Sequence, residues 1–147
     1  MSIHEVKRTA LVTYTPEQMF DLVVDVERYC EFLPWVKGAH VHEKTARDLL
    51  ASLTMERAGV KQTFTTRNVM DRPNWMSLTL VEGPFKTLEG LWTFAPIGNS
   101  GTKIVLDMKF QFGSALTSML FGKAFEHSIG QLIDAFVARA KVTYGPA

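Results

Sequence analysis

The sequence predicts an α+β fold in which an antiparallel sheet of about seven strands packs on one long C-terminal helix. Three observations predict it. A strand-like segment and two short helical segments open the chain, about six strand-like segments with short connections follow, and a long segment with one apolar face ends it.

The first strand and the helix after it have clear local signals. Residues 3–13 are rich in β-branched side chains that partly alternate with polar ones, which is typical of a strand. Thr15 is a favourable N-cap, Pro16 fits the first helical position, and Gln18 completes a capping box. These residues predict a helix that begins at Pro16.

A second short helix is predicted directly after the first. Asp25 can cap it, and it reaches Tyr29 before Pro34 ends the helical segment. Two short helices therefore separate the first strand from the rest of the sheet.

The middle of the chain predicts a meander of antiparallel strands. Between Trp35 and Phe112, turn residues at Gly59, 72–74, 83–84 and 98–101 divide the strand-like segments. Each connection is too short for the crossover that parallel strands need. In the last segment, residues 102–112, apolar and polar side chains alternate, so one face of the sheet is expected to be covered.

The C-terminal segment predicts the helix that covers this face. Ser114 can cap a helix that runs to about Tyr144. Gly122 and Gly130 lie inside it, which indicates either close packing on the sheet or a space above it. One apolar stripe of this helix consists of Phe121, Phe125, Ile129, Leu132, Phe136 and Ala140.

Composition narrows the class of protein. The 147 residues suit a single domain over residues 1–147. The net charge of +1 is spread without a block of like charge, so we expect no DNA partner. Cys30 is the one cysteine, which excludes an internal disulfide and suits a reducing compartment. The first twenty residues lack the apolar core of a secretory signal, so we expect a cytoplasmic protein, with a peripheral position at the inner membrane face as an alternative.

Metal and nucleophile chemistry find little support in the residues. His40 and His42 alternate on one strand and can share a face, but no further ligand motif completes a metal site. Cys30 and His127 lack a local signature and an orienting group. We therefore predict no catalytic residue and no metal.

Polar groups inside the fold are the better candidates for a site. Arg67, Asn68 and Glu56 are candidates to converge in an interior cavity, and alternation along the strand leaves open which of Arg67 and Asn68 points inward. An inward residue can orient a carbonyl or quinone oxygen by hydrogen bonding. The alternative for Arg67 is an ion pair with a surface carboxylate.

Three stretches, together with the order of the elements, carry a resemblance to a known family. They are "FLPWV" (32–36), "TFTTRN" (63–68) and "GPFKTLEGLWTF" (83–94). The chain resembles the START-like helix-grip superfamily, in the polyketide cyclase branch that contains coenzyme Q-binding proteins and the bacterial ribosome-association toxin. The resemblance implies a curved sheet that grips the long helix around an apolar cavity. Members commonly carry a cysteine where this chain has Val36, so no role for that cysteine is carried over.

Gly90 bears on the shape of this cavity. It shares the parity of Leu88, Trp92 and Phe94, so the missing side chain faces the same side as the aromatic rings. A strand can bend there, or another group can come close. We predict a cavity lined by Phe64, Arg67, Asn68, Gly90, Trp92, Phe94, Met108, Phe110, Phe125 and Ile129.

A cavity mouth that touches a membrane surface is a further hypothesis, since apolar residues gather in two loops and at the start of the long helix. The alternative is that these residues pin the loops to the core. The predicted mouth residues are Phe32, Leu33, Pro34, Trp35, Phe85, Met119, Leu120 and Phe121.

Three functions follow from the residues and the resemblance. The first is non-catalytic binding of ubiquinone or a related isoprenoid lipid, in support of respiratory quinone function and with no required cofactor. The alternative is a ribosome-association toxin that binds the large ribosomal subunit and blocks subunit joining, although the basic residues Lys61, Lys86, Lys103, Lys109 and Lys123 are scattered in sequence. A polyketide cyclase or aromatase is third, because no catalytic constellation is visible.

Overall fold

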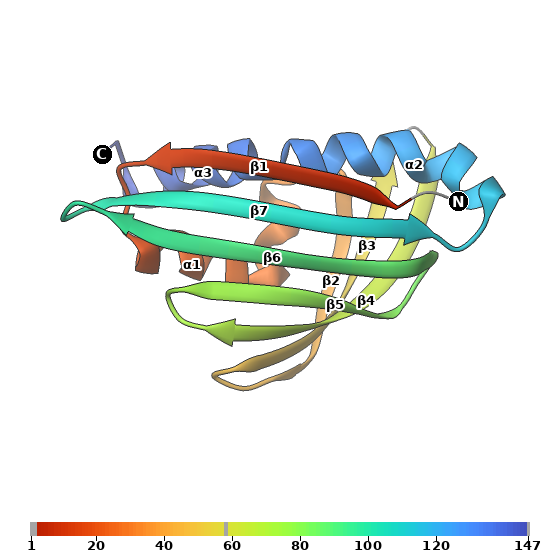
Figure 1. Ribbon diagram of the computed structural model, residues 1–147, viewed down its shortest axis with the longest axis horizontal. Coiled ribbons are helices and arrows are strands. Elements are labelled where there is room, and N and C mark those ends of the chain that lie inside the picture. The colour runs from red at the N-terminus through yellow and green to blue at the C-terminus, as the bar shows by residue number, and fades with distance from the viewer. Residues whose placement is uncertain (1–2, 58, 147) are drawn as a thin grey trace.

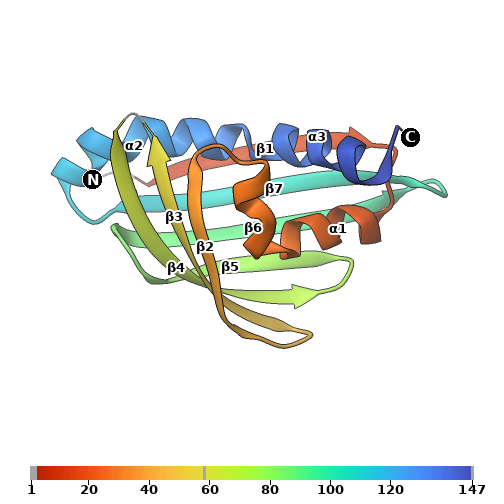
Figure 2. The same ribbon diagram turned by 180° about the vertical axis from the view of Figure 1, so that it is seen from behind.

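Seven strands form one antiparallel sheet, which curves so that the C-terminal helices lie along one side of it (Figures 1 and 2). The computed structural model describes residues 3–57 and 59–146. The strand order β1-β7-β6-β5-β4-β3-β2 pairs the first strand with the last and leaves β1 and β2 at the edges. The predicted α+β helix-grip class, with its curved antiparallel sheet, is confirmed.

The elements follow the predicted order. The strands are β1 (His4–Val12), β2 (Val36–Lys44), β3 (Asp48–Arg57), β4 (Val60–Asp71), β5 (Trp75–Glu82), β6 (Phe85–Ile97) and β7 (Gly101–Phe112). The helices are α1 (Pro16–Val24), the 3-10 helix η1 (Val26–Glu31), α2 (Ala115–Gly130) and α3 (Leu132–Tyr144).

Helix α1 begins where the capping box predicts. The Gln18 backbone N–H donates to Thr15 Oγ1 at 3.2 Å, and the Thr15 N–H donates to Gln18 Oε1 at 2.9 Å. Two backbone donors of the first turn are thereby satisfied, which fixes the point where the chain leaves β1.

The second short helix is present but is not capped as predicted. It is the 3-10 helix η1, and the Asp25 side chain makes no capping hydrogen bond to the residues that the structure describes. Its carboxylate instead pairs with Arg28, with Nε and Oδ2 3.1 Å apart. The Asp25 backbone, with φ −83° and ψ 68°, is also outside the extended conformation that an N-cap residue usually has.

The C-terminal helix is interrupted at Gln131, whereas the sequence predicts one helix from Ser114 to Tyr144. Its start is as predicted, since Ser114 Oγ accepts the Thr117 N–H at 3.1 Å. The break follows Gly130, which disfavours helix, and Ser128, whose hydroxyl donates to the Ala124 carbonyl at 2.8 Å. Two helices therefore share the concave side of the sheet.

Phenylalanine rings fill one end of the space between sheet and helix. The Phe125 ring contacts the rings of five other phenylalanines, with centroids 4.9 to 6.2 Å apart. They are Phe64, Phe85, Phe110, Phe112 and Phe121. This aromatic cluster closes the end of the molecule where α2 begins.

Among residues 3–57 and 59–146, no helix combines the length and the hydropathy that a membrane crossing requires.

Candidate functional site

A cavity of about 80 Å³ lies between the sheet and the helices. The sheet contributes Val36, Ala51, Leu53, Met55, Phe64, Thr66, Asn68, Met76, Leu78, Leu88, Trp92, Leu106 and Met108. Helices and loops contribute Val26, Tyr29, Leu33, Trp35, Phe125, Ile129, Leu132 and Phe136. Among the described residues, the wall contains no carboxylate, lysine, arginine, histidine or cysteine, so it suits an apolar molecule.

Most of the predicted cavity residues lie in this wall. They are Phe64, Asn68, Trp92, Met108, Phe125 and Ile129. Four predicted residues lie outside it, namely Arg67, Gly90, Phe94 and Phe110, and each has a physical reason.

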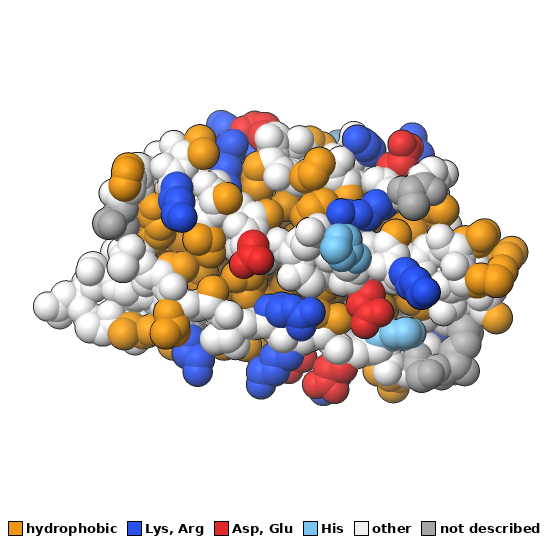
Figure 3. Space-filling model, turned by 90° about the horizontal axis from the view of Figure 1, so that it is seen from above, with side chains coloured by type: hydrophobic (Ala, Val, Ile, Leu, Met, Phe, Trp, Pro, Cys, Tyr) orange, Lys and Arg blue, Asp and Glu red, His pale blue; other side chains and the backbone are white. Residues whose placement is uncertain are grey.

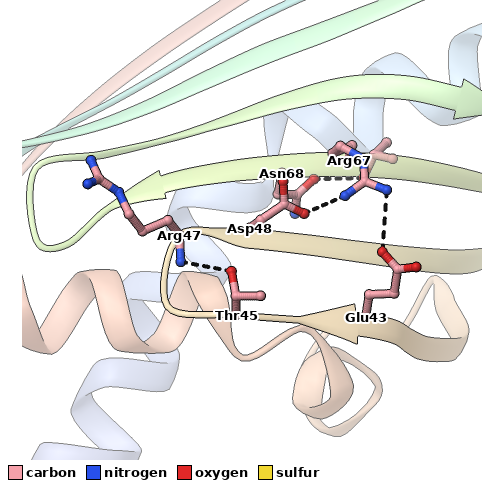
Figure 4. A network of polar contacts seen from close by, with 7 residues as sticks. Glu43, Thr45, Arg47, Asp48, Arg67 and Asn68 are labelled. Carbon is pink, nitrogen blue, oxygen red and sulfur yellow. Dashed lines mark hydrogen bonds and ion pairs between the residues drawn. The ribbon is translucent and has the colours of Figure 1, made fainter.

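Arg67 faces the opposite side of the sheet from Asn68. Its guanidinium pairs with Asp48 at 2.5 Å and with Glu43 at 3.5 Å (Figure 4). The side chain is 42% exposed. The prediction that Arg67 lines the cavity is therefore wrong, because neighbouring residues of a strand point to opposite faces and Asn68 takes the inward position.

Asn68 and Thr66 form the polar part of the wall. The Thr66 hydroxyl donates to Asn68 Oδ1 at 2.8 Å, and Asn68 is 2% exposed. The Asn68 Nδ2 atom lies 3.9 Å from the thioether sulfur of Met76, which is a weak acceptor. An amide nitrogen carries two N–H groups, so Asn68 retains donor capacity beside an apolar space.

Gly90 shapes the cavity without lining it. A Cβ atom at this position would lie 2.2 Å from Met108 Sδ and 3.1 Å from Leu78 Cδ1. Met108 stands opposite Gly90 in the β6–β7 register. The missing side chain is thus room for Met108, which lies in the wall, and the predicted wall position of Gly90 is corrected.

Phe94 and Phe110 lie behind the wall. The Phe94 ring packs on Phe20 with centroids 5.6 Å apart, and Phe110 belongs to the aromatic cluster around Phe125. Both are inward and buried, and neither belongs to the cavity wall.

The residues predicted for one mouth lie in two separate places. Leu33 and Trp35 are in the cavity wall, beside the half-buried Phe32 and the exposed Pro34. Met119 and Leu120 are 73% and 55% exposed, near the start of α2. Hydrophobic side chains gather at that end of the molecule in Figure 3.

Phe85 and Phe121 are not mouth residues. They are 6% and 1% exposed and pack inside the aromatic cluster. The Gly113 N–H donates to the Pro84 carbonyl at 2.9 Å, which ties the loop before Phe85 to the end of β7 and brings its ring into the core.

The phenol of Tyr29 lies in a part of the wall that is shielded from water. Burial raises the pKa of its phenol, and the carboxylate of Asp25 raises that pKa further. The hydroxyl donates to the Val23 carbonyl. Tyr29 therefore remains neutral, and its hydroxyl is already in use within the protein.

The remaining polar candidates lie away from the cavity. His40 and His42 are exposed on β2 with ring centroids 4.6 Å apart, and His42 Nε2 is 2.8 Å from Ser52 Oγ. In the part of the chain that the structure describes, no three His, Cys, Asp or Glu side chains are placed to hold a metal.

Cys30, His127 and Glu56 are also exposed, on η1, α2 and the end of β3. None of the three belongs to the cavity wall. The structure therefore does not bring the candidate nucleophile, base and carboxylate to the enclosed space.

Comparison with known proteins agrees with this architecture. Residues 12–137 match the family described as polyketide cyclase / dehydrase and lipid transport. A ribosome association toxin RatA from Vibrio cholerae is 42% identical over 141 residues, covering 96% of this chain and 98% of that protein. A mitochondrial coenzyme Q-binding protein COQ10 from Drosophila melanogaster is 28% identical, covering 92% of this chain and 58% of that protein.

Solved structures extend the likeness in fold. The aromatase/cyclase Zhui from a Streptomyces species has a TM-score of 0.83 at 18% identity, covering 95% of this chain and 94% of that one. At that identity the likeness shows the shared fold alone.

Replacing Gly90 by alanine should lower the free energy of unfolding by about 1–3 kcal/mol, because Met108 must leave its position. Urea unfolding measures the loss. The double variant Gly90→Ala/Met108→Ala should lose less than the sum of the two single changes. Gly38→Ala is the matched control, since its Cβ would have ordinary contacts at 3.6 Å with Thr54. Additive losses in the double variant would contradict this role of Gly90.

Proposed function

Because this chain belongs to the polyketide cyclase / dehydrase and lipid transport family, we propose that it binds an apolar small molecule between the sheet and α2–α3 without changing it chemically. The wall composition carries this proposal, since it is apolar apart from Thr66, Asn68 and the phenol of Tyr29. A site for acid–base chemistry needs titratable groups that converge on the ligand.

The ligand we propose is a quinone or a related isoprenoid with a carbonyl oxygen. Asn68 can donate to that oxygen, while Trp92, Phe125 and Phe136 contact the ring and tail. The name of the coenzyme Q-binding relative supports ubiquinone as the first ligand to test. Such a protein would support respiratory quinone function as a carrier.

Ligand entry requires the wall to move. An engineered cavity of about 150 Å³ holds one benzene molecule, and the cavity here has about 80 Å³. Met55, Met76 and Met108 lie in the wall, and methionine side chains repack readily. The structure is then the closed form of an expandable pocket.

The energy of such binding is sufficient without chemistry. Burying about 200 Å² of apolar ligand surface contributes about 5 kcal/mol at roughly 25 cal/mol per Å². One hydrogen bond from Asn68 adds about 1 kcal/mol. The apolar area thus sets affinity, and the amide sets which ligands are preferred.

A second candidate function is docking on the large ribosomal subunit. The toxin relatives, at 38–42% identity over nearly the whole chain, favour it. The outer face of the sheet is mixed in charge, because Lys109 stands between Glu5 and Glu89 in the register. Lys103 stands between Leu11 and Ala95, away from acidic partners in the register.

A cyclase function has less support. It rests on solved structures whose likeness shows the fold alone. Among the residues that the structure describes, the cavity wall includes no carboxylate or histidine that could act as acid or base.

Asn68→Leu should weaken binding of a short-chain benzoquinone about tenfold, because the buried quinone carbonyl loses its hydrogen-bond donor. Affinity for an alkylbenzene of the same size should stay equal or rise. Tryptophan fluorescence titration measures both. Thr66→Val, which keeps the Asn68 amide donors, should have a smaller effect on the quinone. Equal losses for quinone and alkylbenzene would show that Asn68 is structural only.

Met119→Asp or Leu120→Asp should lower binding to phosphatidylcholine vesicles about tenfold, since Met119 and Leu120, together with Leu116, are exposed apolar side chains near the start of α2. Vesicle cosedimentation measures this. Leu11→Asp is the matched control, because Leu11 is 71% exposed at the end of β1, outside this patch. Unchanged binding in Met119→Asp and Leu120→Asp would remove the membrane contact from the proposal.

If the ribosomal function holds, cosedimentation with large ribosomal subunits should fall steeply with salt, because phosphate contacts release counterions. Lys103→Glu should reduce it and leave benzoquinone binding unchanged, since residue 103 is exposed on the outer face. Val105→Thr, on the same face without a charge change, is the control. Salt-independent cosedimentation, or none, would count against this function.

A further inference from the structure

Arg57 joins the end of β3 to the interruption between α2 and α3. Its Nη1 donates to Ser128 Oγ at 2.8 Å, and its Nη2 donates to Gln131 Oε1 at 3.1 Å. The guanidinium carbon also lies 5.0 Å from the ring centroid of Trp35. One half-buried side chain therefore holds three segments that are far apart in the sequence.

The partners of Arg57 are parts of the cavity wall or its direct neighbours. Trp35 lies in the wall, and Ser128 and Gln131 flank the wall residue Ile129 together with Gly130. Met55, two residues before Arg57, is also in the wall. The loop after η1, the end of β3 and the helix interruption thus meet around a single guanidinium.

Arg57 contacts the helix interruption on both sides of Ile129–Gly130. Helix α3 has no side-chain cap from Gln131, whose side-chain oxygen accepts from Arg57 instead. The backbone N–H of Gln131 donates to the Ser128 carbonyl at 3.2 Å, which tightens the last turn of α2. A helix that is already interrupted can change the angle between its halves at little cost in hydrogen bonds.

The need for such a change comes from the size of the cavity. With about 80 Å³, the space is smaller than one that holds a benzene ring. Arg8 of β1 also lies beside Gly130, whereas at the start of α2 the helix meets the sheet through the aromatic cluster, and opening that contact would expose apolar surface to water. Around Arg57 the contact is polar, so water can replace its hydrogen bonds at a small net loss.

We propose that Arg57 is a latch that closes the cavity, and that its release from Ser128 and Gln131 lets the helix interruption move away from Trp35 and admit the ligand. This inference rests on the proposed function, because it concerns how that same cavity is opened. It assigns Arg57 to control of ligand exchange and gives it no contact with the ligand.

A purely structural arginine would behave differently. Its loss would lower the free energy of global unfolding. It would not specifically speed amide exchange at the helix interruption or change the rates of ligand exchange. Removing a latch lowers the barrier to opening of the cavity. Ligand association and dissociation then both become faster, while the equilibrium affinity changes little.

The experiment compares Arg57→Ala, Gln131→Ala, their double variant and Arg57→Lys with the wild-type chain. Arg57→Lys keeps the charge but loses the forked geometry that reaches two acceptors. Arg47→Ala is the matched control, because Arg47 is an exposed arginine in the turn between β2 and β3 (Figure 4). Urea unfolding confirms that each variant is folded.

The first readout needs no ligand. Amide hydrogen exchange of residues 128–133 should be about tenfold faster in Arg57→Ala than in wild type, because two hydrogen bonds from a charged group are lost. Gln131→Ala should give part of this effect, and the double variant should add little to Arg57→Ala. Exchange in the aromatic cluster should not change.

The second readout is stopped-flow tryptophan fluorescence with a short-chain benzoquinone. In Arg57→Ala both rate constants should rise about tenfold, with the dissociation constant within about threefold of wild type. The rate constants of Arg57→Lys should lie between those of the wild type and those of Arg57→Ala.

Outcomes separate this inference from the function on which it rests. Benzoquinone uptake by wild type with unchanged rates in Arg57→Ala would overturn the latch and leave the proposed function in place. No uptake by wild type would overturn the proposed function, and the exchange rates would still decide whether Arg57 holds the helix interruption closed. Exchange equal to that of Arg47→Ala would overturn the latch in either case.

Discussion

The packing of the C-terminal helices on the concave side of the sheet is the contact on which the rest of the structure depends, and two aromatic anchors hold it. Phe125 anchors α2 through its ring contacts in the aromatic cluster, with no exposed surface of its own. Phe136 anchors α3 through the rings of Tyr29, Phe32 and Trp92, with centroids 5.1 to 5.4 Å apart. The helix interruption at Gln131 lies between the two anchors, and both anchors contribute to the cavity wall.

This arrangement explains why one fold can be stable and still contain a compliant space. Rings that interlock at both ends resist displacement, because moving one opens a gap for its neighbours. The wall also includes flexible thioether side chains, those of Met55, Met76 and Met108, and the helix is already broken between the anchors. The polar contact of Arg57 closes this middle part of the wall. The segment that can move most easily is therefore also the segment that Arg57 holds in place.

Local signals made much of the fold predictable, and contacts between distant segments explain the corrections. The capping box at Thr15 and the turns between strands depend on neighbouring residues, so the sequence shows them directly. The helix interruption follows Ser128 and Gly130, and it is contacted by Arg57, which is 74 residues from Gln131. Phe85 follows a turn, a position that predicts a mouth residue, but the backbone contact of Pro84 with Gly113 directs its ring into the core. Of Arg67 and Asn68, only the register of β4 decides which side chain is inside.

The alternation of side chains along the strands also bears on the different names of the relatives. On β7 Met108 faces the cavity, and the next residue, Lys109, is exposed on the other face. The same holds for Ile104, which is buried, and Lys103, which is exposed. Substitutions on the outer face can therefore alter docking to a large partner while the cavity keeps its shape, and substitutions inside can change the ligand while the outer face is kept. The two proposed functions, ligand binding and ribosome docking, would therefore use different faces of the sheet, so evidence for one of them is no evidence against the other.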